Sequence, residues 1–78
     1  MNARPLSCLR QHERCVLQSL EQTGGYRRRL RDLGFQPGTE VTCAYVAPSG
    51  SPMAFWVRGA MVALREADCR QILVSPHE

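Results

Sequence analysis

Residues 26–38 read YRRRLRDLGFQPG, and this stretch is the most informative one for the fold. Counted at 100° per residue, Tyr26, Leu30 and Leu33 share one side of a helix. Gly34 follows where a glycine commonly ends a helix, and a Pro-Gly pair then indicates a tight turn. A helix of about two turns does not form alone in water. The pattern therefore predicts a short helix that docks its apolar side on a sheet.

The arginines of this stretch lie away from its leucines. Arg27, Arg28 and Arg31 fan across the opposite side of the helix, and Arg29 lies at the border. Two interpretations stay open, a solvated helix face and a docking face whose guanidinium groups pair bidentately with acidic residues of a protein partner. A phosphate grip for nucleic acid is less favoured, because few aromatic residues are left for base stacking.

Short strand-like segments surround the helix. They lie at residues 14–20, 40–47, 53–58, 60–65 and 70–75. Helical turns are expected within residues 5–11 and 65–69, and alternation puts Val41, Cys43 and Tyr45 on one side of their strand. A lone glycine between the third and fourth segments predicts a bulge or a tight bend. The fold class is therefore mainly β, a small barrel of about five strands with one or two short helices.

Size and composition restrict the class of protein. With 78 residues the chain forms a single domain, residues 1–78. All ten basic residues are arginine, yet a net charge of +3 is modest for a nucleic-acid binder. No apolar run approaches the roughly 20 residues that span a bilayer, and residues 1–14 lack the apolar core and the small-residue cleavage site of a signal peptide. We therefore expect a cytoplasmic protein without membrane insertion. No nucleophile–base pairing is visible in the sequence, so we expect no enzyme.

The cysteines raise the question of a metal site. Cys8, His12 and Cys15 are spaced by four and three residues, which on a helix would align them as three zinc ligands. Cys15 falls in a strand-like segment, however, which breaks that geometry, and His77 is distant in sequence. These residues are weak candidates, and no cofactor is expected.

Two further features allow either a structural or a binding role. The loop APSGSP is either an ordinary hairpin connection or a stiff recognition tip, and its candidate contact residues are Pro48, Ser49, Gly50, Pro52 and the adaptable Met53 that follows. Trp56 either packs under the short helix or, if Phe55 and Val57 face inward, lies outside as an interface anchor.

The ordered set of motifs resembles the FeoA family. The stretch RRLRDLGFQPGTEV (28–41) is followed by APSGSPMAFWVRGAMVALREAD (47–68), and the resemblance covers about residues 6–74. The matching positions are Arg29, Leu30, Asp32, Leu33, Gly34, Pro37, Gly38, Val41, Ala47, Pro48, Gly50, Pro52, Val57, Gly59, Leu64 and Arg65. One departure is that many members carry Pro-Gly just before the first strand, where this chain has Gln11 and His12.

The resemblance implies both a fold and a role. The fold is an SH3-like barrel, and the role is a non-catalytic, accessory one in ferrous iron uptake. The partner would be the cytoplasmic GTPase-bearing region of the FeoB membrane transporter, and homo-oligomers stay open. A related module forms the C-terminal domain of some metal-dependent repressors, so a metal-responsive interaction module remains an alternative, as does a small nucleic-acid-binding barrel.

Overall fold

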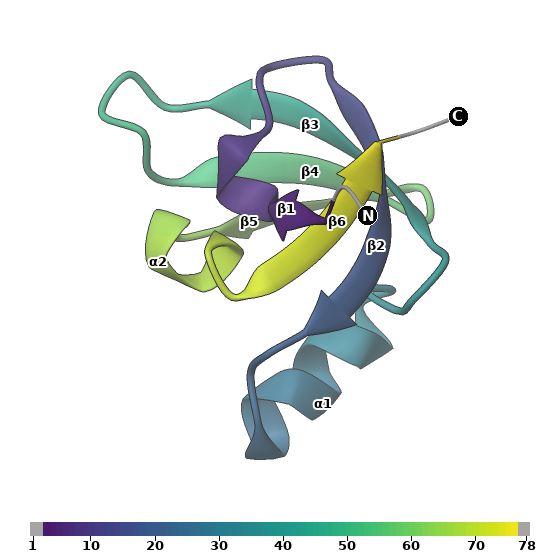
Figure 1. The fold of residues 1–78 in the computed structure, drawn as a ribbon. Helices are drawn as coiled ribbons and strands as arrows, with labels where there is room; N and C mark the ends of the chain where they lie inside the picture. Colours follow the sequence, from purple (N-terminus) through teal and green to yellow (C-terminus); the bar gives the residue numbers. More distant parts are fainter. Residues whose placement is uncertain (1–2, 77–78) are drawn as a thin grey trace.

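The structure, a computed structural model, describes residues 3–76 and is mainly β (Figure 1). Its elements in chain order are β1 (Arg4–Pro5), the 3₁₀ turn η1 (Leu6–Cys8), β2 (Arg14–Leu20), α1 (Gly24–Asp32), β3 (Glu40–Val46), β4 (Met53–Val57), β5 (Ala60–Leu64), α2 (Glu66–Cys69) and β6 (Ile72–Pro76). The fold class and the five predicted strands are confirmed, and β1 is a short addition to them. Within residues 3–76 no helix has the length and apolar character that crossing a membrane requires.

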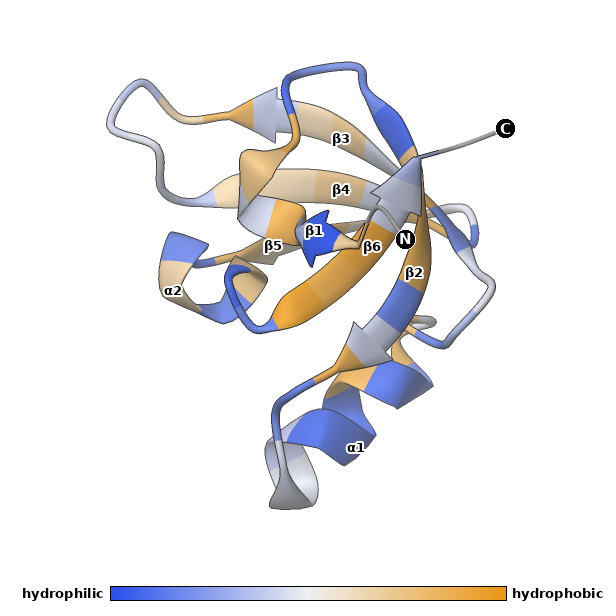
Figure 2. Cartoon of the chain, in the orientation of Figure 1, coloured by the Kyte–Doolittle hydropathy of each residue, from blue (hydrophilic) through white to orange (hydrophobic). Residues whose placement is uncertain are grey.

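The strands form one antiparallel, strongly curved sheet in the order β1-β6-β2-β3-β4-β5. In Figure 1, β6 crosses in front of β4 and β5, so the sheet wraps around a single core. α2 packs against η1, while α1 lies below the barrel, between β2 and β3 in the chain. Figure 2 shows the difference in polarity, since the barrel strands are mostly apolar and α1 is mostly polar.

The core is filled by apolar side chains from all layers. The largest that are fully buried are Phe35, Phe55, Leu6, Leu17 and Leu30. Burying one such side chain stabilises the fold by about 1.5–3 kcal/mol relative to leaving it in water. Three of the four cysteines, Cys15, Cys43 and Cys69, also lie in this core as free thiols. In a small domain this one cluster has to supply most of the stability.

A β-bulge in β2 explains the imperfect alternation of this strand. Leu17 pairs with Val74 and Ser19 with Leu73, so Gln18 is an extra residue on one side of the ladder. The bulge shifts the phase of the strand by one residue. Leu20 is consequently buried, although simple alternation would put it opposite Leu17.

A second bulge, in β3, corrects the sequence prediction for Tyr45. Cys43 pairs with Phe55 and Tyr45 with Ala54, which leaves Ala44 as the extra residue. Val41 and Cys43 are fully buried, but Tyr45 lies on the outer face and is 49% exposed. The prediction that these three residues share one side was therefore wrong, because a bulge reverses the sides of all residues beyond it.

The turn before β2 contains Gln11 and His12, where many proteins of the resembling family carry Pro-Gly. The N–H of Glu13 donates to the carbonyl oxygen of Arg10 at 3.0 Å, and His12 has a φ of 75°. Positive φ at the third position of a turn suits glycine, and proline suits the second position. Gln11 and His12 therefore adopt a backbone geometry for which Pro-Gly is better suited.

Candidate docking surfaces

The C-terminal end of α1 is fixed to the barrel by a Schellman motif. The N–H of Phe35 donates to the carbonyl oxygen of Leu30 at 3.0 Å, and the N–H of Gly34 donates to that of Arg31 at 3.0 Å. Gly34 has a φ of 115°, which L side chains rarely adopt. Leu30 and Phe35 are both fully buried, so they anchor the helix end in the core.

Gly34 also lies directly against the β4–β5 hairpin. A Cβ at Gly34 would come within 2.8 Å of the Arg58 Cδ and 2.9 Å of the Val57 Cγ1. The hairpin turns through two residues with positive φ, Arg58 at 50° and Gly59 at 82°, which is the type I′ geometry. Gly59 thus forms a tight bend, and Gly34 allows α1 to approach that bend closely.

The turn after α1 is held by β2. Gly38, with a φ of 89°, donates its N–H to the carbonyl oxygen of Leu17 at 2.8 Å, and the N–H of Leu17 donates to that of Thr39 at 2.9 Å. The N–H of Thr39 bonds the carbonyl oxygen of Gln36, so Pro37 and Gly38 occupy the centre of a type II turn.

The N-terminal end of α1 is held by α2. The side-chain amide of Gln22, only 6% exposed, donates to the backbone carbonyl oxygen of Asp68 at 2.9 Å, while its Oε1 has no partner in the described part of the chain. Burial, together with the carboxylate of Asp68, raises the pKa of Tyr26 above its usual value. The sequence offered no signal for this role of Gln22, because a lone glutamine usually lies in solvent.

The apolar side predicted for α1 is narrower than expected. Leu30 is fully buried, but Tyr26 and Leu33 are 37% and 42% exposed. The prediction that all three dock on the sheet was wrong. The helix is held at its ends by the contacts of Gln22 and Gly34, and within Gly24–Asp32 only Leu30, in the last turn, enters the core.

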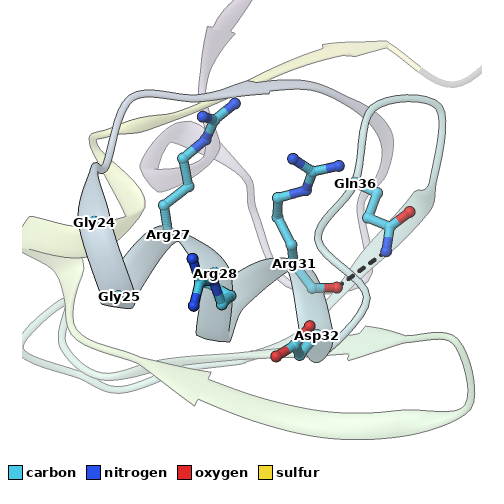
Figure 3. A pocket seen from close by; sticks show the side chains of 7 residues that line it. All are labelled: Gly24, Gly25, Arg27, Arg28, Arg31, Asp32 and Gln36. Carbon is cyan, nitrogen blue, oxygen red and sulfur yellow. Dashed lines mark hydrogen bonds between the residues drawn. The ribbon is translucent and has the colours of Figure 1, made fainter.

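The three arginines predicted on the opposite side of α1 lie together on one concave surface, which we call the arginine hollow (Figure 3). It has a volume of about 610 Å³, and it is lined by Gly24, Gly25, Arg27, Arg28, Arg31, Asp32 and Gln36. In Figure 3 the guanidinium ends of Arg27 and Arg31 extend to the same side of the helix. Gln36 donates from Nε2 to the carbonyl oxygen of Arg31 at 3.1 Å and closes one end.

The arginines of α1, including the three that line the arginine hollow, form no ion pair within residues 3–76. Four arginines and one aspartate give α1 a charge of +3, which equals the net charge of the whole chain. The ion pairs of the described residues are Arg4–Glu13, Arg14–Glu40, Arg65–Asp68 and Arg70–Glu66. None of them involves α1. Like charges four residues apart destabilise a helix by about 0.2–0.5 kcal/mol, so Arg27 and Arg31 do not stabilise α1.

The loop between β3 and β4 is tied to the barrel. Within it, the N–H of Gly50 donates to the carbonyl oxygen of Ala47 at 2.7 Å. Ser51 accepts a bond at its Oγ from the N–H of Glu66, 3.0 Å, and so caps α2 next to its N-cap residue, Arg65. The candidate contacts Pro48, Ser49 and Pro52 are exposed, and Gly50 is half-buried.

Met53 does not belong to this candidate surface. It is the first residue of β4 and is only 2% exposed, opposite the buried Leu64. The prediction of an adaptable surface contact was wrong, because the strand begins immediately after the loop and its first side chain points into the core.

Trp56 lies on the outer face of the sheet. Phe55 and Val57 are fully buried, so Trp56 is directed outward and is 48% exposed rather than packed under α1. Its cross-strand neighbour Met61 and the nearby Tyr45 are 51% and 49% exposed. These three side chains form an apolar surface on β3, β4 and β5, which we call the aromatic face.

The weak metal candidates do not form a site. Cys8 and His12 are exposed, whereas Cys15 is fully buried and desolvation raises the pKa of its thiol to about 12. A thiol with such a pKa is not a thiolate at neutral pH, and thiolate is the form that binds metal. Residues 3–76 contain no group of three metal-ligating side chains. His77 lies outside the described residues.

Known structures share this fold. The FeoA protein of Chlorobium tepidum is 28% identical with a TM-score of 0.89, and the alignment covers 95% of this chain and 70% of that one. FeoA of Stenotrophomonas maltophilia, a prokaryotic SH3 domain protein solved with zinc, is 32% identical with a TM-score of 0.78, covering 91% and 88%. IdeR of T. acidophilum shares the fold alone, at 14% identity and a TM-score of 0.85, covering 99% of this chain and 35% of that one.

These likenesses confirm the SH3-like class that the FeoA resemblance implied, and with it the small barrel predicted from the strand pattern. No curated protein sequence matches the chain. A FeoA domain model matches residues 4–76, which is nearly all of the sequence. With its SH3-like fold and its 32% identical relative, the chain belongs to the FeoA family, a family associated with ferrous iron transport.

Proposed function

We propose that this protein is a non-catalytic accessory protein of ferrous iron uptake that acts in the cytoplasm. Its partner is the cytoplasmic GTPase-bearing region of the FeoB membrane transporter. The observation that carries this proposal is the FeoA domain match over residues 4–76 on an SH3-like fold. The Stenotrophomonas maltophilia relative is itself named as a candidate activating factor of ferrous iron transport.

The surfaces of the described residues support binding rather than catalysis. The arginine hollow is lined by arginines, glycines, one aspartate and one glutamine, and its lining contains no nucleophile next to a general base. The arginine hollow and the aromatic face lie on different elements, α1 and the β3–β4–β5 sheet. Two such surfaces on a small rigid barrel suit an adaptor that contacts a larger partner.

Uptake measurements in the native organism test the role. Removing the gene should lower initial uptake of radioactive ferrous iron by at least fivefold, and expression of the intact chain should restore it. FeoB abundance is measured in parallel, so that loss of transport is separated from loss of transporter. Unchanged uptake, together with no binding of the protein to full-length FeoB in lipid nanodiscs at 100 μM, contradicts the proposal.

A further inference from the structure

We propose that the arginine hollow on α1 is the site that binds FeoB, and that it recognises an acidic segment of the transporter's cytoplasmic region. This inference rests on the proposed function and specifies its docking surface. The segment carries at least two carboxylates about 6 Å apart, the spacing of side chains one helical turn apart.

The first argument for this site is the geometry of Arg27 and Arg31. Arg27 and Arg31 are four residues apart on α1, so their side chains are neighbours on one side of the helix. Figure 3 shows their guanidinium groups extended to that same side. Each guanidinium offers a planar fork that fits one carboxylate with two parallel hydrogen bonds. Two aspartates or glutamates at i and i+4 of a partner helix, or at alternate positions of a strand, match this pair.

Charge complementarity is the second argument. α1 carries four arginines and one aspartate, and no ion pair of the described residues reaches the helix. Elsewhere in the same chain, arginines such as Arg70 are paired with a carboxylate. The unpaired charge is therefore concentrated on one element, where an acidic partner would be steered and held.

The shape of the hollow admits another chain. Gly24 and Gly25 line one end of it, and a Cβ at either position would meet no atom within 4 Å. A partner backbone can therefore approach this end without steric hindrance from side chains. Arg27 adjoins this end, and Arg31 lies one turn further along the helix.

The lining favours a protein over a nucleic acid. A nucleic-acid surface combines phosphate contacts with aromatic side chains that stack on bases. No aromatic residue lines the arginine hollow. Of the exposed aromatic side chains, Tyr26 lies on α1 outside the lining, and Tyr45 and Trp56 lie on β3 and β4. Binding of carboxylates requires only planar guanidinium groups, which the arginines of the hollow provide.

Charge reversal tests the site in the full chain. Binding to full-length FeoB in neutral-lipid nanodiscs is measured by biolayer interferometry at 50 and 500 mM NaCl. We expect Arg27→Glu/Arg31→Glu to weaken binding at least 20-fold and Arg27→Gln/Arg31→Gln at least 5-fold. The matched control Arg10→Glu/Arg65→Glu removes the same charge from exposed positions outside the hollow and should change affinity less than 2-fold. For the intact protein, the higher salt should weaken binding at least 10-fold, because it shortens the screening length.

The partner side is identified by hydrogen exchange of FeoB with and without the protein. The segment protected by the intact chain should contain at least two Asp or Glu residues within five positions. Arginines introduced at those positions should restore binding of Arg27→Glu/Arg31→Glu to within 3-fold of the native affinity. Circular dichroism and thermal unfolding of each variant verify that the fold is retained.

The outcomes separate this inference from the proposed function. If the intact chain binds FeoB and the hollow variants bind equally well, or if the protected segment lacks carboxylates, the inference fails and the proposed function stands. If the intact chain does not bind FeoB at all, both fail. Binding of a 20-base-pair RNA or DNA duplex that is lost in the hollow variants, without effect on FeoB binding, assigns the surface to phosphate and overturns the inference.

Discussion

Replacing Gly34 by alanine tests how α1 is joined to the barrel. An L residue at φ 115° is strained by about 1–3 kcal/mol, whatever the space around it. The added methyl group would also lie 2.9 Å from the Cγ1 of Val57, a fully buried and stiff side chain. Overpacking of this kind costs about 1–3 kcal/mol more. Gly34→Ala should therefore lower the free energy of unfolding by about 2–6 kcal/mol.

Urea denaturation followed by circular dichroism measures this loss, and two other glycines serve as matched controls. Gly38→Ala has a φ of 89° but no neighbour within 4 Å, so only the strain of about 1–2 kcal/mol should appear. Gly25 has open space and lies in the helix, so Gly25→Ala should stabilise the protein by about 0.5–1 kcal/mol. A Gly34→Ala loss no greater than that of Gly38→Ala would refute the reasoning that close contact with Val57 determines this position.

Four further predictions concern His12, the cysteine thiols and Trp56. His12→Gly should stabilise the protein by about 0.5–1 kcal/mol in urea denaturation, because a φ of 75° strains histidine but not glycine; a loss of stability would contradict this. Ellman's reagent should modify one thiol quickly in the native protein, that of the exposed Cys8, and all four after unfolding; a second fast thiol would disprove the burial of the others. Burial raises the pKa of Cys15 and Cys69 from 9.0 to about 12, so these thiols ionise first in the unfolded chain and stability falls above pH 9. The fall should be about 1.4 kcal/mol per pH unit for each thiol between pH 9 and 12, and an unchanged unfolding free energy from pH 8 to 10.5 would argue against it. Trp56→Ala should cost about 1–3 kcal/mol, because roughly half of the side chain is buried, and a loss above about 4 kcal/mol, as for a fully buried aromatic residue, would contradict its place on the outer face.

The helix end and the turns could be predicted from the sequence, because each requires a backbone conformation that few residues adopt. Gly34 ends α1 at φ 115°, and Gly59 bends the β4–β5 hairpin at φ 82°. Glycine is the residue that reaches such angles without strain, so its position marks the turns directly. The strands could then be predicted from the residues that lie between these turns.

The sides of the strands were less predictable, because a bulge leaves no clear mark in the residues. Ala44 shifts β3 by one position, and Tyr45 consequently points outward. Met53 lay inside the predicted segment 53–58, but the sequence left open which side of this strand faces the core. Met53 is buried because it shares the inner side of β4 with Phe55 and Val57. On α1, periodicity alone could not show that the helix is held at its ends, which leaves Tyr26 and Leu33 half-exposed.

The way α1 is held explains why its arginines can serve binding without weakening the fold. The helix has two glycines in its first turn, an N-cap Thr23 without a side-chain hydrogen bond, and adjacent like charges, so its own propensity is poor. It is stabilised instead by Leu30 and Phe35 in the core, and at its start by the contact of Gln22 with α2. None of these contacts involves a guanidinium group. Loss of binding in arginine-hollow variants should therefore report on the surface itself, because folding is determined by other residues.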